Sequence, residues 1–213
     1  MRRLSAGTLG GARSVEAPAF DRSGPAPIVH LGPGAFARGH LGVYADDLCR
    51  AGHPARVRAV ALRHPRAAEL LGPQDGLYTV TVREPSRLPR TRLVGAVTSI
   101  ATGPGAAVLA VADPATAVVT LTITEQGYEG IGPDTAAGVV AAGLDARRRR
   151  GQGGVVVASL DNLLDNGRVL RARVLEAADT AAPGLADWIE AHVSFPSSVV
   201  DRMVPATTGA DRA

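Results

Sequence analysis

The sequence of 213 residues contains no lysine, one cysteine and few aromatic side chains. All 23 basic residues are therefore arginines, so chemistry that needs a lysine amine would have to come from elsewhere. The single Cys49 cannot form an internal disulfide. No second cysteine and no nearby histidine pair could join it as metal ligands, so we expect no metal site. This cysteine usage fits a reducing compartment, so we expect a cytoplasmic protein.

Long hydrophobic runs are also lacking. No stretch approaches the roughly 20 apolar residues of a membrane-spanning helix. Arg2 and Arg3 are not followed by the apolar segment that an export signal needs. We therefore expect neither export nor a membrane partner. The composition, with 46% hydrophobic and 20% charged residues, is that of a globular protein.

The excess positive charge is concentrated in one run of the sequence. The formal net charge is +3, and residues 147–150 are four consecutive arginines. Arginines at the end of a predicted helix complement the negative end of its dipole, and no aromatic residues lie among them to stack on bases. The run predicts a solvated helix end, and we expect no nucleic-acid partner.

Short β-branched runs alternate with segments of helical spacing from residue 27 onward. The predicted strands are residues 28–31, 57–62, 77–82, 93–100, 117–124 and 155–160, and the predicted helices are residues 36–51, 105–112, 133–150, 167–178 and 184–192. This alternation predicts an α/β fold with a doubly wound, mainly parallel sheet and a helical C-terminal segment. We predict a disordered tail over residues 1–26, one domain over residues 27–208 and a C-terminal tail over residues 209–213.

A glycine-rich motif follows the first predicted strand and opens the first predicted helix. It reads Gly32-Pro33-Gly34-Ala35-Phe36-Ala37, a Gly-x-Gly-x-x-Ala pattern. In dinucleotide-binding domains the first glycine permits a tight turn, the second lets the backbone approach the pyrophosphate, and the last small residue lets the helix pack on the strand. The motif predicts a pyrophosphate site at the start of that helix. A plain glycine–proline turn is the alternative.

The residues after the second predicted strand bear on the choice of cofactor. An acidic residue usually stands there and binds the ribose 2′-hydroxyl of NAD. This sequence has Arg63 and Arg66 instead, and no acid. Guanidinium groups could receive the 2′-phosphate of NADP. They could equally be surface side chains of an arginine-rich chain, so the sequence leaves both NAD and NADP open.

Polar residues follow two later predicted strands, within residues 124–128 and 159–162. Ligands of open parallel sheets bind outside the carboxyl ends of the strands. Asn162 could donate a hydrogen bond to a substrate oxygen that gains negative charge. Its alternative role is a helix cap or a turn before the next helix.

Six stretches carry a resemblance to a known family. They are residues 28–40 (IVHLGPGAFARGH), 74–78 (QDGLY), 121–128 (LTITEQGY), 159–163 (SLDNL), 166–167 (NG) and 195–205 (FPSSVVDRMVP). In this order they resemble the mannitol dehydrogenase and fructuronate reductase family of polyol-specific long-chain dehydrogenases. The resemblance extends over about residues 27–208.

The resemblance implies the Rossmann domain of a metal-independent oxidoreductase that uses NAD or NADP. Such enzymes move a hydride between the nicotinamide and a secondary alcohol or ketone of a polyol, a sugar acid or a polyol phosphate, such as mannitol, mannonate, altronate or mannitol 1-phosphate. The residues that it implies for cofactor binding are Gly32, Pro33, Gly34, Ala35, Phe36, Ala37, Arg38, Thr124 and Glu125. It implies that Asn162 polarises the reacting oxygen and that Asp201 lies at the substrate pocket.

The sequence departs from the family in one chemical respect. The family's general base is a lysine on a second, helical domain, whereas this sequence has no lysine and stops soon after Asp201. We expect the isolated chain to lack the roughly 10²–10⁴-fold contribution of acid–base catalysis. Three interpretations stay open: a dehydrogenase that is incomplete in this chain, a non-catalytic nucleotide-binding module or truncated gene product, and half of a split enzyme completed by a second chain.

Overall fold

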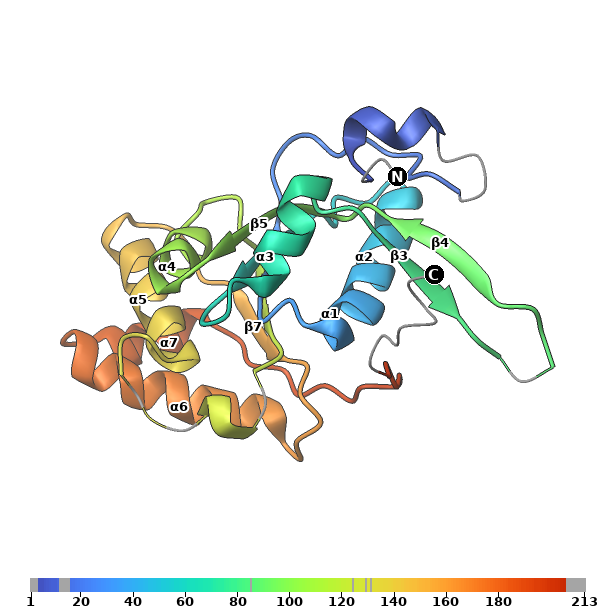
Figure 1. The fold of residues 1–213 in the computed structure, drawn as a ribbon. Coiled ribbons are helices and arrows are strands. Elements are labelled where there is room, and N and C mark those ends of the chain that lie inside the picture. Colours follow the sequence, from blue (N-terminus) through green and yellow to red (C-terminus); the bar gives the residue numbers. More distant parts are fainter. Residues whose placement is uncertain are drawn as a thin grey trace.

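A computed structural model of the chain describes residues 4–11, 16–84, 86–123, 125–128, 130 and 132–205. The strands are β1 (Ile28–Leu31), β2 (Val57–Ala61), β3 (Tyr78–Val82), β4 (Arg90–Val94), β5 (Val97–Thr102), β6 (Val118–Leu121) and β7 (Val156–Ser159). The helices are α1 (Ala35–Gly39), α2 (Leu41–Arg50), α3 (Arg66–Leu71), α4 (Pro104–Val111), α5 (Ala136–Arg149), α6 (Asn166–Ala181) and α7 (Leu185–His192), and the 3₁₀ turns are η1 (Ala6–Gly11), η2 (Gly72–Gln74) and η3 (Glu125–Tyr128). Strands and helices alternate along most of the chain (Figure 1).

Within the described residues, five strands form one parallel sheet in the order β5-β2-β1-β6-β7. The chain builds outward from β1 through β2 to β5 and then returns to add β6 on the other side of β1. This is the doubly wound sheet of a Rossmann fold, as predicted from the sequence. Leu31 pairs with both Val60 and Leu121, so the carboxyl ends of β1, β2 and β6 lie level at one edge.

Each face of the sheet packs against its own group of helices. The alternate residues Val29 and Leu31 of β1 belong to the larger core, together with buried residues of α4, α5, α6 and α7. β3 and β4 pair as a separate antiparallel hairpin. Ile28 packs with the second core, which includes Val43 and Cys49 of α2 and residues of this hairpin. Figure 1 shows α4 to α7 gathered on one side and α1 and α2 on the other. Helices on both faces explain why the strands read as nearly continuous apolar runs.

The prediction of one strand over residues 93–100 was wrong. The chain instead ends β4 at Val94, turns at Gly95, and begins β5 at Val97. The N–H of Gly95 donates to the buried carboxylate of Asp46 over 2.7 Å, and its carbonyl accepts from Arg22 over 2.8 Å. Because side chains take both backbone groups, Gly95 cannot take part in a continuous strand ladder.

The predicted helix over residues 36–51 is divided into α1 and α2 at His40. A continuous helix would use the carbonyl of Arg38 as an acceptor for the N–H of Gly42. That carbonyl instead accepts from the hydroxyl of Tyr78 over 2.9 Å. A Cβ on Gly42 would lie 1.9 Å from the same hydroxyl, so the break depends on this close approach of the hairpin.

Residues 16–26, which the sequence assigned to a disordered tail, contact the domain in the structure. Arg22 donates to the carbonyls of Gly95 and Val97, at 2.8 and 3.0 Å. Glu16 forms an ion pair with Arg50 over 2.8 Å. Hydrophobic periodicity could not predict these contacts, because polar groups make them. The domain limits at 27 and 208 stay predictions, and residues 209–213 lie outside the described residues.

The sequence predicted that the whole arginine run at the end of α5 is solvated. In the structure one of its arginines is buried. Arg147 is only 4% exposed and donates to the carbonyls of Val111, Asp113 and Gly153, at 3.2, 2.7 and 3.0 Å. Arg148 forms an ion pair with Asp145 over 3.0 Å. The prediction failed at Arg147 because three carbonyls of neighbouring loops converge on its guanidinium.

Several chemical possibilities find no support in the described part of the chain. No helix there is long and apolar enough to cross a membrane. No group of three or more His, Cys, Asp or Glu side chains there could hold a metal ion. Cys49 is buried, and this burial raises the pKa of its thiol, so the reactive thiolate is disfavoured at neutral pH.

Candidate functional site

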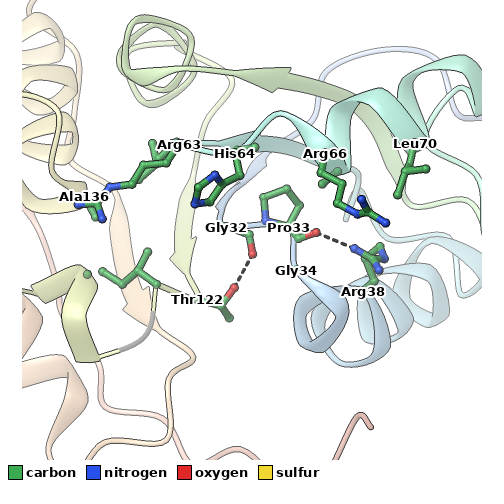
Figure 2. A pocket seen from close by; sticks show the side chains of 15 residues that line it. Gly32, Pro33, Gly34, Arg38, Arg63, His64, Arg66, Leu70, Thr122 and Ala136 are labelled. Atoms are coloured by element: carbon green, nitrogen blue, oxygen red, sulfur yellow. Dashed lines mark hydrogen bonds between the residues drawn. The ribbon is translucent and has the colours of Figure 1, made fainter. Parts of the chain in front are cut away.

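A cavity of about 410 Å³ lies at the carboxyl ends of β1, β2 and β6. Its lining comes from three segments of the chain, within residues 32–38, 61–70 and 122–136. Figure 2 shows the glycine loop as the floor of this cavity, with the side chains that follow β2 above it. The strand order reverses between β1 and β6, and this is where open α/β sheets bind their ligands.

Gly32, the first glycine of the motif, is required by the fold. Its φ is +94°, and a Cβ there would lie 2.2 Å from the carbonyl oxygen of Thr122. Its N–H donates to the carbonyl of Val60 over 3.0 Å, and its own carbonyl accepts from the Thr122 hydroxyl over 2.6 Å (Figure 2). Only glycine combines this conformation with this contact.

Gly34, the second glycine, is not required by the fold. Its φ is −66°, which any residue adopts, and a Cβ there would meet no atom closer than 3.9 Å. The bare backbone therefore leaves open space at the edge of the cavity. Such space is what a diphosphate needs to approach main-chain N–H groups closely.

The first turn of α1 offers hydrogen-bond donors beside this space. The N–H of Arg38 donates to the carbonyl of Gly34 over 3.2 Å, so the N–H groups of Ala35 and Phe36 precede the first bond of the helix. α1 has only five residues, so its dipole is weaker than the sequence suggested. The N–H groups of Gly32 and Gly34 already donate to the carbonyls of Val60 and Gly32, so the open backbone donors are those of this first turn.

Arg38 both closes the loop and adds charge. Its Nη1 donates to the carbonyl of Pro33 over 2.9 Å (Figure 2). Burial lowers the pKa of this guanidinium, which nevertheless stays protonated. A guanidinium has five N–H donors, and the structure assigns only one of them a hydrogen bond within the described residues.

His30 supports the glycine loop from below. It is 2% exposed, its Nδ1 lies 2.9 Å from the Thr120 hydroxyl, and its Nε2 lies 3.1 Å from the carbonyl oxygen of Gly32. Burial lowers the pKa of His30 to about 4, so the imidazole is neutral at pH 7. Because the carbonyl oxygen of Gly32 can only accept, the ring proton is on Nε2, which leaves Nδ1 to accept from the Thr120 hydroxyl. His30 is therefore a hydrogen-bonded core histidine.

The rim of the cavity is basic and exposed. Arg63, His64 and Arg66 follow β2, and none of their side chains makes a hydrogen bond or an ion pair within the described part of the chain. Among the described residues that line the cavity there is no aspartate and no glutamate. Together with Arg38, the rim gives the cavity a positive potential.

Asn162, the predicted polarising residue, follows β7 and is exposed. Within the described residues its amide makes no hydrogen bond, and the residue before α6 is Asp165. The alternative role as a helix cap is therefore not seen. Its neighbour Asp161 accepts from the N–H of Ile123 over 3.1 Å and from the hydroxyl of Tyr128 over 2.9 Å, which joins the loop after β7 to the cavity wall.

Asp201, the predicted substrate residue, lies over the junction of α1 and α2. Its carboxylate accepts from the hydroxyl of Tyr44 over 2.9 Å and lies 3.3 Å from Nε2 of His40. The Tyr44 bond lowers the pKa of Asp201, whereas burial lowers the pKa of His40. His40 stacks on Phe36 of the motif, at 5.0 Å between ring centroids. Sequence reasoning missed this cluster, although the four-residue spacing of Phe36, His40 and Tyr44 was a signal.

Asn166 holds the segment that carries Asp201. It is 1% exposed, its Nδ2 donates to the carbonyl of Ser198 over 3.0 Å, and its Oδ1 accepts from the Ser198 N–H over 2.9 Å. The sequence suggested no such role. Of the other predicted site residues, Thr124 lies outside the described residues, and Glu125 begins η3 with a side chain that is not described. Their assignment to the nicotinamide stays a prediction.

Residues 26–213 match the family model of the mannitol dehydrogenase Rossmann domain. The chain belongs to the mannitol dehydrogenase family. The cavity and its glycine loop are thus features of a mannitol dehydrogenase Rossmann domain, and the resemblance inferred from the six sequence stretches is confirmed.

Characterised members of the mannitol dehydrogenase family resemble the chain over nearly its full length. The chain is 37% identical to a mannitol 2-dehydrogenase of Cereibacter sphaeroides over 92% of its own length and 46% of the relative. It is 34% identical to a polyol:NADP oxidoreductase of Gluconobacter oxydans, with the same two shares. The ternary complex of Pseudomonas fluorescens mannitol 2-dehydrogenase with NAD and D-mannitol superposes with a TM-score of 0.89, at 33% identity, over 98% of this chain and 49% of that chain. The chain spans about half the length of the curated relatives it matches.

Proposed function

We propose that the chain is the dinucleotide-binding part of a dehydrogenase of the mannitol dehydrogenase type, acting on a secondary alcohol or ketone of a polyol, sugar acid or polyol phosphate. One observation carries the proposal. Gly32 has a backbone conformation and a contact that only glycine permits, whereas Gly34 keeps its backbone bare towards an open cavity. The relatives include a mannitol 2-dehydrogenase and a polyol:NADP oxidoreductase, which supports this substrate class.

The chemistry of the cavity fits a nicotinamide dinucleotide, NAD or NADP. Its donors are backbone N–H groups and the Arg38 guanidinium, and its described lining residues include no carboxylate that would repel a diphosphate. The bound cofactor would supply the group that accepts or releases the hydride. The chain's part is to hold the diphosphate on the loop at residues 32–38 and to orient the cofactor along the carboxyl ends of the strands.

On the substrate side, we assign the reacting oxygen to the amide of Asn162. That amide is exposed and is without a hydrogen bond within the described residues, so it is free to donate to an oxygen that gains negative charge. Asp201 would bind substrate hydroxyls, and Thr124 and Glu125 would lie at the nicotinamide. With no lysine in the 213 residues, the proton acceptor of the family would have to come from residues outside this sequence.

The absence of lysine also favours a second candidate, a module that binds the dinucleotide without turnover. The two candidates differ in whether a lysine-bearing helical chain restores activity with a polyol or sugar acid. We place either form in the cytoplasm, on the strength of the single buried cysteine.

A titration of the purified chain with NADH and with NADPH tests the proposal. Saturable enhancement of nicotinamide fluorescence is expected with at least one of the two. Gly34→Ala should weaken that binding by about tenfold or more, because its methyl group fills the space needed for the approach of the diphosphate, and tenfold corresponds to about 1.4 kcal/mol. The thermal midpoint of this variant serves as the folding control.

The absence of a saturable signal with both nucleotides, from chain that unfolds cooperatively, would refute the proposal. Turnover is measured separately, with mannitol, mannonate, altronate and mannitol 1-phosphate. The chain by itself should show negligible turnover with each of them. Substantial turnover would contradict the role that we give to a lysine from elsewhere.

A further inference from the structure

Most arginines of this chain have partners in the structure. Arg50, Arg58 and Arg92, for example, form ion pairs with aspartates at 2.6 to 2.9 Å. Among the arginines that the structure describes, only Arg63, Arg66 and Arg90 have a guanidinium without a hydrogen bond, ion pair or ring contact. Two of these three line the cavity. The unpaired guanidiniums are thus concentrated at the cavity, which argues against the interpretation of Arg63 and Arg66 as ordinary surface arginines.

The position of the two side chains relates them to one part of a dinucleotide. When a diphosphate lies on the loop after β1, the adenosine ribose lies over the end of β2, and the residue there contacts the ribose 2′ position. β2 ends at Ala61, and Arg63 and Arg66 follow it at the rim of the cavity. Figure 2 shows Arg66 extending towards Arg38 and Arg63 extending towards Ala136, with His64 between them. The rim is therefore cationic along its length above the glycine loop.

The charge of the rim distinguishes the two cofactors. A carboxylate would accept from the 2′-hydroxyl of NAD, but the part of the cavity lining that the structure describes contains none. A 2′-phosphate carries about −1.5 to −2 charges at neutral pH if it resembles other phosphate monoesters. It would meet guanidiniums that have no competing carboxylate partner, and guanidinium and phosphate match in bidentate geometry.

We propose that this cavity selects the 2′-phosphorylated dinucleotide, NADP(H), and that Arg63 and Arg66 bind its 2′-phosphate. The inference rests on the proposed function, since it needs a dinucleotide on the glycine loop. It goes further by assigning the specificity for the cofactor to two residues.

Dissociation constants for NADPH and NADH, measured by fluorescence titration on the whole chain, test the inference. NADPH should bind at least about tenfold more tightly than NADH at low ionic strength. The ratio should fall as salt is added, because the contacts are exposed and ionic. Competition by 2′-AMP but not by 5′-AMP at equal concentration would place the preference on the 2′-phosphate itself.

Three variants assign the effect to residues. The double variant Arg63→Gln/Arg66→Gln should weaken NADPH binding about tenfold or more and change NADH binding less than about twofold, which brings the ratio near one. The two single variants divide the effect between the residues. Arg90→Gln is the matched control, because Arg90 is also unpaired but lies on β4, away from the cavity lining, and it should leave both affinities unchanged.

The outcomes separate the two proposals. Equal binding of both nucleotides, or tighter binding of NADH, would overturn the inference and leave the proposed function standing. A preference for NADPH that survives in the double variant would overturn the assignment to Arg63 and Arg66. Failure to bind either nucleotide would overturn both the inference and the proposed function.

Discussion

The floor and the rim of the cavity are built on opposite principles. In the floor, the polar groups of Gly32 and His30 are hydrogen-bonded within the protein. A Cβ added at Gly32 would clash with the backbone of Thr122. In the rim, Arg63 and Arg66 are exposed and make no hydrogen bond or ion pair within the described residues. The floor therefore sets the shape of the site, whereas the rim is left available to a ligand. Groups that the fold does not use are the better guide to what a protein binds.

The strongest test of this contrast is Gly32→Ala. A methyl group there would lie 2.2 Å from the carbonyl oxygen of Thr122, and φ of +94° is unfavourable for alanine. We expect a loss of about 3 to 5 kcal/mol in the free energy of unfolding, from backbone strain together with overpacking. Urea denaturation measures this loss. Gly34→Ala, with no atom closer than 3.9 Å to the new Cβ, should lose less than about 1 kcal/mol.

Similar losses for the two glycine variants would remove the distinction between a structural first glycine and a second glycine kept bare for the ligand. If Gly32→Ala does not fold, its yield of soluble chain relative to Gly34→Ala provides the comparison. Equal yields would contradict the steric argument.

Lowering the pH should weaken the floor through His30. Burial lowers the pKa of His30 to about 4 in the folded chain, while the unfolded chain keeps a value near 6.5. The unfolded state then binds more protons between these values, so this contribution is complete above about pH 6.5 and is lost as the pH falls to about 4. The loss should reach roughly 3 kcal/mol.

Urea denaturation between pH 7 and pH 4 measures this change, and NMR titration of the imidazole gives the pKa directly. In His30→Asn that part of the pH dependence should be absent. If the His30 imidazole of the folded protein instead titrates near pH 6.5, burial does not disfavour its charged form and the prediction is wrong.

The smallest expected effect on the free energy of unfolding is that of a rim arginine. A variant of the buried Arg147 provides the comparison. Arg147→Gln leaves the carbonyls of Val111 and Gly153 without a donor and leaves that of Asp113 with the Thr116 N–H alone, so we expect a loss of about 2 kcal/mol in the free energy of unfolding. Arg66→Gln removes an exposed side chain without a partner, so the loss should stay below about 0.5 kcal/mol. Urea denaturation of both variants measures the pair. A loss at Arg66 as large as that at Arg147 would mean that the rim arginine supports the fold.

Several elements of the fold were predictable because their signals are local. β1 has the predicted limits, and the Gly-x-Gly-x-x-Ala motif follows β1 and opens α1 as expected. The errors at residues 36–51 and 93–100 share another cause. In each case a side chain distant in sequence, Tyr78 or Asp46, bonds a backbone group that the local pattern assigned to a helix or a strand.

The candidate site divides in the same way. The residue types at its floor and rim, and the absence of an acid after β2, can be read from the order of residues alone. The sequence left the role of Arg63 and Arg66 open, because it does not show whether an arginine has an ion-pair partner in the folded chain.

The amino-acid sequence by itself determined the alternation of strands and helices, the glycine motif, and an all-arginine set of basic residues without lysine. These follow from side-chain period and backbone freedom, which neighbouring residues decide. Only the tertiary structure decided that Gly32 meets Thr122, that Arg147 is buried and that Arg66 is free. The physical reason is that contacts and burial depend on segments that fold together from distant parts of the chain.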